Sequence, residues 1–185
     1  MQKQEQRLTS MALKYVHTTA VSIWIGGGLA VLVLLYRDRL TRNGDELFAL
    51  NYAIAAIDDF LIKPAAATTF MSGVMICLLT NWRVFRHRWI IVKLVLTLGA
   101  LVFGAICLGP WLKELSRITA ADRLAVLDDG GYYRAYRLGA TSAVLQSALL
   151  FVLVLISIFK PDVGPRKKPF PVPLRQRLCI TPAGR

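Results

Sequence analysis

His17 is the side chain in this sequence with the clearest capacity for chemistry. It stands in an uncharged run, Tyr15–Tyr36, that is long enough to cross a bilayer as a helix. Ionisable side chains are costly to bury inside a membrane and therefore mark functional sites by default. An imidazole at this position can ligate haem iron or copper, or relay a proton. The alternative is a neutral histidine that hydrogen-bonds a neighbouring helix.

Two sulfur side chains extend this hypothesis to a metal site. Met75 and Cys77 lie in a second uncharged run that crosses in the opposite direction, which brings them to the depth of His17. Histidine, thioether and thiolate together suit copper, and histidine with methionine suits haem b. Lys93, at a similar depth, opposes a bound cation unless its amine reaches the interface. We predict His17 as the cofactor-binding residue and His17, Met75 and Cys77 as candidate metal ligands. The alternative is that both sulfur residues only pack in the bundle.

Another polar position lies in the last uncharged run. Gln146 and Ser147 either hydrogen-bond to another span or line a ligand or quinone pocket. The first run instead carries small residues at Ser22, Gly26, Gly27 and Gly28, which allow helices to approach closely. The sequence contains no nucleophile elbow, phosphate-binding loop or zinc-protease motif, so it favours a non-enzymatic role.

Membrane-spanning helices must position these residues. Hydrophobic residues make up 55% of the 185-residue chain and are gathered in four long uncharged blocks. Backbone groups in lipid have no water to pair with, so each block must be helical. We predict an all-α polytopic membrane protein, a four-transmembrane-helix bundle with spans at about 12–36, 64–82, 89–112 and 138–159. The transmembrane domain then covers 12–160, between an N-terminal segment 1–11 and a disordered basic tail 161–185.

The link between the first two spans carries a further helix. Asn43-Gly44 predicts a turn before it. Apolar residues then recur at three- and four-residue spacing, at Leu47, Leu50, Ile54, Ile57 and Leu61. We expect an amphipathic helix on the outer face that joins span two through a kink at Pro64. Asp58 and Asp59 would then lie near the outer interface.

The distribution of charge predicts the orientation. The N-terminal segment, the turn after span two and the C-terminal tail together carry the whole formal net charge of +12, whereas the charges of the other two loops sum to zero. Loops rich in Lys and Arg face the cytoplasm, so both termini are predicted to be cytoplasmic. We expect these basic segments to contact anionic lipid head groups and not nucleic acid.

Three motifs together resemble a known family. Span one opens with Tyr15-Val16-His17-Thr18 and continues into Ser22-Ile23-Trp24-Ile25-Gly26-Gly27-Gly28. The other two are Lys63-Pro64 followed by Thr69 and Ser72-Gly73 in span two, and Trp89-x-x-x-Lys93-Leu94 opening span three with Lys160-Pro161 closing span four. From about residue 12 to 161 the chain resembles the four-span predicted integral membrane proteins called DUF2269. The resemblance implies a protein of the bacterial cytoplasmic (inner) membrane without an assigned activity.

Two further families share only a histidine in the first span. The copper-resistance protein D family usually has more spans, and the membrane protoporphyrinogen oxidase family implies haem and histidines that this chain lacks. Only His17 matches either family. Three hypotheses therefore stand: a non-enzymatic membrane protein of unassigned role, a haem- or copper-binding redox or metal-handling protein that uses His17, and an accessory subunit. The last would form a homo-oligomer or join a larger membrane complex.

Overall fold

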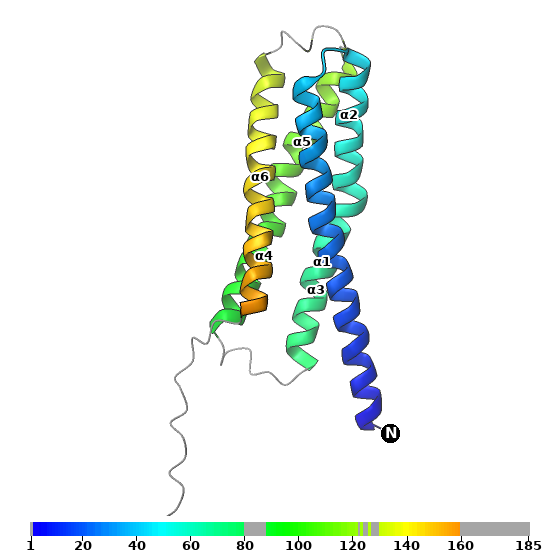
Figure 1. Cartoon of the computed structure of the whole chain (residues 1–185), viewed down its shortest axis with the longest axis vertical. Helices are drawn as coiled ribbons and strands as arrows, with labels where there is room; N and C mark the ends of the chain where they lie inside the picture. The colour runs from blue at the N-terminus through cyan, green and yellow to red at the C-terminus, as the bar shows by residue number, and fades with distance from the viewer. Residues whose placement is uncertain (1, 80–87, 122, 124–125, 127–129, 160–185) are drawn as a thin grey trace, which may run out of the picture.

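The computed structural model describes residues 2–79, 88–121, 123, 126 and 130–159, and every regular element in that part is helical (Figure 1). In chain order the elements are α1 (Gln2–Leu40), α2 (Gly44–Ile57), the π-helical segment η1 (Asp58–Ile62), α3 (Lys63–Leu79), α4 (Arg88–Phe103), the π-helical segment η3 (Gly104–Leu108), α5 (Gly109–Ala121) and α6 (Gly130–Phe159). The predicted tail 161–185 and the end of the predicted second span, 80–82, lie outside the described residues.

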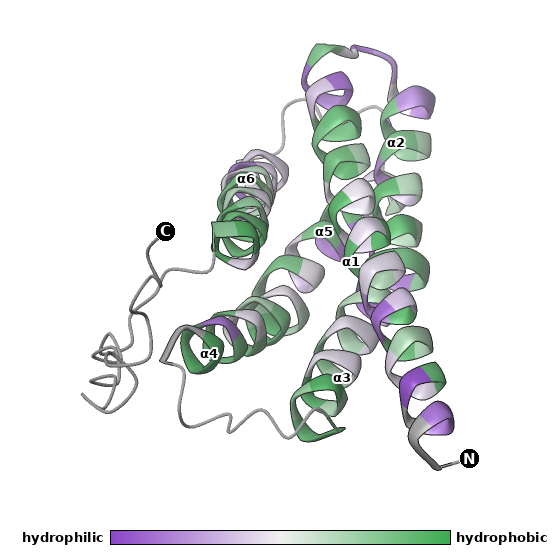
Figure 2. Cartoon of the chain, turned by 60° about the horizontal axis from the view of Figure 1, so that its bottom comes forward, coloured by the Kyte–Doolittle hydropathy of each residue, from purple (hydrophilic) through white to green (hydrophobic). Residues whose placement is uncertain are grey.

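These elements form antiparallel rods. α1 and α6 are single helices, whereas α2, η1 and α3 follow one another without a break, as do α4, η3 and α5. Four of the described helical stretches are long and apolar enough to cross a membrane, and Figure 2 shows α3 and α4 to be largely hydrophobic. The predicted four-transmembrane-helix bundle, with an additional helix before span two, is therefore confirmed. We call α2, α5 and the parts of α1 and α6 beside them the upper half, and α3, α4 and the parts of α1 and α6 beside them the lower half (Figure 1).

The start of α2 is fixed by two neighbouring residues. The Oδ1 atom of Asn43 accepts a hydrogen bond from the backbone N–H of Asp45 at 3.0 Å, which caps the helix. A Cβ atom at Gly44 would collide with the carbonyl oxygen of Arg123, so only glycine fits there. The predicted turn at Asn43-Gly44 is present, and it brings the beginning of α2 against Arg123.

The predicted kink at Pro64 takes the form of a π-helical turn. The backbone N–H of Lys63 bonds to the carbonyl of Asp58, five residues earlier. Pro64 has no N–H to donate, and in a regular α-helix its ring clashes with the carbonyl four residues before it. The wider turn of η1 accommodates the proline, and the rod continues into α3.

The buried face of this rod differs in part from the predicted apolar stripe. Leu47 and Ile54 of the predicted apolar stripe are buried, but Leu61, its last member, is 46% exposed. Asn51 and Asp58 occupy inward positions instead. The predicted stripe continues the α-helical spacing of three and four residues past Ile57. A π turn holds one residue more than an α-helical turn, so beyond Ile57 this spacing no longer identifies the residue on the buried face.

A buried polar network joins three helices of the upper half. Asp38 of α1 accepts hydrogen bonds from Asn51 Nδ2 of α2 at 2.8 Å and from the Tyr132 hydroxyl of α6 at 2.7 Å. All three side chains are at most 4% exposed. A buried carboxylate needs such donors to offset its lost hydration, so the network holds the upper ends of these helices in one arrangement.

Candidate functional site

A small cavity lies inside the bundle at the junction of the two halves. Its volume is about 20 Å³. It is lined by Trp24 and Val31 of α1, Asp58 and Ile62 of η1, Leu108 of η3, and Gln146 of α6, among others. Polar groups therefore converge on an otherwise apolar space, and we call this the polar cavity.

Asp58 is the ionisable residue of the polar cavity. Its side chain is 4% exposed, and its Oδ2 atom lies 2.7 Å from the ammonium nitrogen of Lys63. That nitrogen also lies 2.5 Å from Oδ1 of Asp59, whose Oδ2 is 3.1 Å from the ammonium nitrogen of Lys113. Two carboxylates and two ammonium groups thus form a cluster without net charge. Only Asp58 is deeply buried within it, whereas Asp59, Lys63 and Lys113 lie nearer the surface.

The polar cavity lies within the length of two uncharged apolar runs and not at their ends. Val31 and Gln146 both line it and belong to the uncharged runs 15–36 and 138–159. At 1.5 Å per residue, Val31 is about 7–8 Å along the helix from the end of its run, and Gln146 is about 12 Å from the start of its run. Asp58 therefore lies level with residues of two uncharged apolar runs, and an ionisable residue at such a depth is the kind of position that marks function.

Two π-helical segments form part of the wall of the polar cavity. η1 ends two residues before Pro64, and η3 ends two residues before Pro110. In η3, as in η1, a backbone N–H bonds five residues back, here from Gly109 to Gly104. Single π turns are frequent at functional sites because they re-aim side chains. The two prolines within long apolar runs are the sequence signal that could have located this site.

Two glycines of the third rod make room for the polar groups. A Cβ atom at Gly104 would lie 3.0 Å from Nε2 of Gln146. A Cβ atom at Gly109 would lie 3.1 Å from Nζ of Lys63 and 3.2 Å from Oδ2 of Asp58. Glycine at both positions lets the backbone of η3 approach the amide, and that of the first residue of α5 approach the ion pair, as small residues do between membrane helices.

Gln146 presents an acceptor that lacks a donor. Its side chain is 8% exposed, and among the described residues no group donates a hydrogen bond to its Oε1 atom. The Oδ2 atom of Asp58 also lacks a hydrogen-bond donor among the described residues. Lys63 compensates its charge, but the geometry of this ion pair does not meet that of a hydrogen bond. Buried polar atoms in proteins are nearly always bonded, so these two acceptors indicate a binding position between them.

His17, the leading candidate from the sequence, lies in the lower half and not in the polar cavity. Its Nδ1 atom is 2.9 Å from Oγ of Ser72 in α3. The Ser72 hydroxyl donates to the carbonyl of Thr68, which leaves its oxygen to accept from Nδ1–H of His17; in a neutral ring with this hydrogen bond, Nε2 is the unprotonated nitrogen. A Cβ atom at Gly73 would lie 3.3 Å from Cε1 of His17, so glycine gives the ring its space.

The other predicted metal ligands are placed less favourably. Met75 is 47% exposed, and Cys77 is partly buried. Lys93 donates a hydrogen bond to Ser157 Oγ at 2.6 Å and acts electrostatically on His17 and on Cys77, so it lies near both. Within the part of the chain that the structure describes, no three His, Cys, Asp or Glu side chains gather as a metal site. The ligand set of His17, Met75 and Cys77 stays a prediction.

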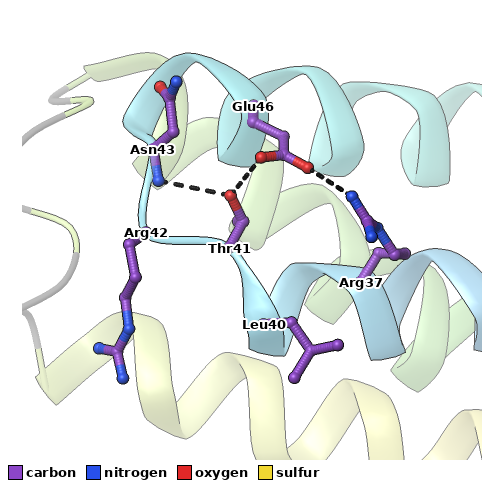
Figure 3. A pocket seen from close by; sticks show the side chains of 6 residues that line it. All are labelled: Arg37, Leu40, Thr41, Arg42, Asn43 and Glu46. Carbon is purple, nitrogen blue, oxygen red and sulfur yellow. Dashed lines mark hydrogen bonds and ion pairs between the residues drawn. The ribbon is translucent and has the colours of Figure 1, made fainter.

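A larger hollow of about 420 Å³ lies on the surface at the turn between α1 and α2 (Figure 3). Its polar groups satisfy one another: Glu46 accepts from Arg37 at 3.1 Å and from the Thr41 hydroxyl at 2.6 Å, and Thr41 Oγ1 accepts from the backbone N–H of Asn43 at 3.3 Å. Arg42 points away from them (Figure 3). These bonds close the turn, and we assign no ligand to the hollow.

The fold and the polar cavity define a class: a small polytopic helical membrane protein with an ionisable group inside its bundle. The chain belongs to the family described as predicted integral membrane protein (DUF2269), whose sequence model matches residues 11–161. No curated protein and no solved structure matches the chain.

Proposed function

We propose that this protein is a non-enzymatic integral membrane protein that binds and releases a proton at Asp58. The observation that carries the proposal is the buried Asp58 carboxylate, which lies level with two uncharged apolar runs and 2.7 Å from the ammonium nitrogen of Lys63. Ionisable residues in such positions, paired with an opposite charge, are the elements of proton relays. The polar cavity, at about 20 Å³, is far smaller than the few hundred Å³ of pockets for organic substrates, which argues against an enzyme acting there.

The ion cluster offers two arrangements that differ by one proton. Lys63 contacts both Asp58 and Asp59, and Lys113 also contacts Asp59. When Lys63 lies against Asp58, the buried carboxylate is stable in its charged form. When Lys63 moves fully to Asp59, displacing Lys113, the Asp58 carboxylate must take up a proton to remain buried. The return of Lys63 releases that proton.

Infrared difference spectroscopy on the protein in lipid vesicles tests the proposal. A change of pH should produce a carboxylic-acid carbonyl band that Asp58→Asn abolishes. Lys63→Gln should keep Asp58 protonated over more of the pH range, because the compensating ammonium group is gone. Glu46→Gln, which removes one partner of the surface pair with Arg37, is the matched control and should leave the band unchanged. The absence of any Asp58-dependent band across the stable pH range of the protein would overturn the proposal.

The orientation of His17 favours a second candidate function, binding of haem b or copper. Histidine ligands commonly donate their second ring N–H to a neighbouring oxygen, which fixes the tautomer, and Ser72 takes that place for Nδ1. His17 would supply Nε2, and a second ligand from the lower half would be needed. An absorption spectrum and metal analysis of the purified protein test this function. A chromophore or copper that His17→Ala removes and His87→Ala retains would support it, and a featureless spectrum after expression with ample haem and copper would exclude it.

The proposed location is the cytoplasmic membrane of a bacterium, with both termini cytoplasmic. The support is the positive charge of the segments on that side, which also suits anionic lipids. Fluorescence of a GFP fused to the C-terminus, together with activity of an alkaline phosphatase inserted after Arg42, would agree with this orientation. The opposite pattern would reverse it.

A further inference from the structure

We infer that the polar cavity binds one water molecule, which donates hydrogen bonds to Asp58 Oδ2 and to Gln146 Oε1 and so links η1 to α6. This inference concerns the residue of the proposed function but does not rest on proton exchange. A water in this position would bridge the two helices even if Asp58 stayed ionised throughout.

The size of the polar cavity matches a single water. A cavity needs roughly 10–15 Å³ by this measure to hold one water molecule. The polar cavity has about 20 Å³, which admits one water and excludes larger ligands.

The chemistry of the wall also matches a water. Gln146 Oε1 and Asp58 Oδ2 are both acceptors, both buried, and neither receives a hydrogen bond from the described residues. The occupant must therefore donate twice, and water has two O–H donors. Ser147 also lines the cavity and carries a hydroxyl group as a third partner for the water. Buried waters typically make about three hydrogen bonds to otherwise unsatisfied groups.

Charge argues for water over a metal cation. The Lys63 ammonium already lies 2.7 Å from the only carboxylate of the polar cavity, and the cluster of which it is part has no net charge. A sodium ion beside Asp58 Oδ2 would be repelled by Lys63 at short range. A neutral donor meets no such repulsion.

Two glycines let neighbouring helices approach closely beside the polar cavity. Gly104 allows the Gln146 amide to lie against η3, with Nε2 as the nearest atom of that side chain. Gly28 of α1 leaves Ser147 Oγ in ordinary contact, since a Cβ there would lie 3.5 Å away. Gln146 is thereby close to the backbone of η3 and Ser147 to that of α1, and the water lies between Gln146 Oε1 and Asp58 Oδ2.

A high-resolution structure of the full chain in lipid nanodiscs tests the inference. The expected result is a density peak within hydrogen-bonding distance, about 2.7–3.0 Å, of both Gln146 Oε1 and Asp58 Oδ2. The peak should be lost in Gln146→Leu and kept in Leu145→Met, a control at an exposed position of the same helix. If Gln146→Leu fails to fold, Ser147→Ala replaces it and should retain the peak with one partner fewer.

Three results would overturn the inference. One is a wild-type structure without density between the two acceptors. Another is a Gln146 amide turned so that Nε2 donates directly to Asp58. The last is a thermal stability that rises in sodium chloride over choline chloride and depends on Asp58, which would identify a bound cation. The infrared test of Asp58 is independent of all three, so failure of one proposal is distinguishable from failure of the other.

Discussion

The upper and lower halves of the bundle are packed in different ways. In the upper half, large apolar side chains are completely enclosed: Leu47, Ile54, Leu112 and Leu115 are each at most 2% exposed. Helices α2 and α5 pack against each other and against α1 and α6 around this core. A buried polar network adds to it. This is how water-soluble domains are built.

In the lower half, small side chains make up half of the buried core. Ala65, Ala66 and Ala100 are buried there together with Trp24, Leu150 and Leu153. Other large apolar side chains of this half point outward, as the 70% exposure of Leu78 illustrates. In lipid, burying such side chains gains little, because the acyl chains are equally apolar.

The difference between the halves lies in how much each depends on burying large side chains. α1 has 39 residues and so extends about 58 Å, whereas a bilayer core is about 30 Å thick. α1 is therefore longer than a bilayer core, and the upper half carries the enclosed core that resembles the packing of water-soluble domains. The polar cavity lies where the two kinds of packing join.

Replacing a core leucine by alanine should show the difference in stability between the two halves most clearly. Leu115→Ala should lower the free energy of unfolding by about 2–5 kcal/mol, since it leaves a cavity in a core that is buried from water. Leu153→Ala in the lower half, at a residue only 5% exposed, should cost less, because the unfolded helix keeps that side chain in lipid. Reversible unfolding by dodecyl sulfate in mixed micelles measures both, and equal losses would contradict the comparison.

Removing the Tyr132 hydroxyl from the buried polar network should have the next largest effect on the free energy of unfolding. Tyr132→Phe removes one of the two side-chain donors to the buried Asp38 and should cost about 1.5–3 kcal/mol. Ser157→Ala, which removes the partner of Lys93 in the lower half, should cost only about 0.6 kcal/mol, as membrane hydrogen bonds do on average. The same unfolding measurement applies. A larger loss from Ser157→Ala than from Tyr132→Phe would reverse the ranking.

A pair of neighbouring glycines tests the junction between the halves. Gly27→Ala would place a Cβ atom 2.8 Å from Cγ1 of Ile62 in η1 and should destabilise the bundle by about 1–3 kcal/mol. Gly26→Ala meets nothing within 4 Å and should be neutral or slightly stabilising, because alanine favours helix. Thermal unfolding in detergent distinguishes the two. Similar results at both positions would mean that η1 adapts freely.

The smallest effect is expected at an exposed ion pair. Glu114 and Arg117 are bonded at 2.5 Å on the surface of α5, where solvent screens the attraction. Glu114→Gln should leave the unfolding transition unchanged at any salt concentration. A clear loss of stability in Glu114→Gln would show that this surface of α5 is shielded from solvent.

The sequence was sufficient for the architecture because long apolar runs can only be helices in lipid. The spans, the turn at Asn43-Gly44 and a helix before Pro64 followed from local patterns. The close helix approach expected from the small residues of span one is present at Gly27, against Ile62. Each of these features depends on residues near one another in the chain.

The polar cavity and the polar network could not be found in this way. Asp38 and Tyr132 are 94 positions apart, and no periodicity connects them. Asp58 was predicted near the outer interface because it precedes the apolar run that begins at Pro64, and its place beside Gln146 depends on residues far apart in the chain. His17 was correctly singled out as polar inside a span, but polarity alone does not say whether a ring is a ligand or is held by a neighbour such as Ser72.

The π-helical segment η3 also constrains the length of the chain. It contains one residue more than an α-helical turn would need. Deleting a single residue between Gly104 and Leu108 would let the rod close as a regular α-helix while α5 keeps its orientation, because the deletion removes the residue that the π turn absorbs. The cost would fall on Pro110, whose ring clashes with the carbonyl four residues earlier in a regular α-helix. A deletion in the regular first turn of α5 would instead rotate the rest of that helix by about 100° and turn Leu112 and Leu115 away from the upper core.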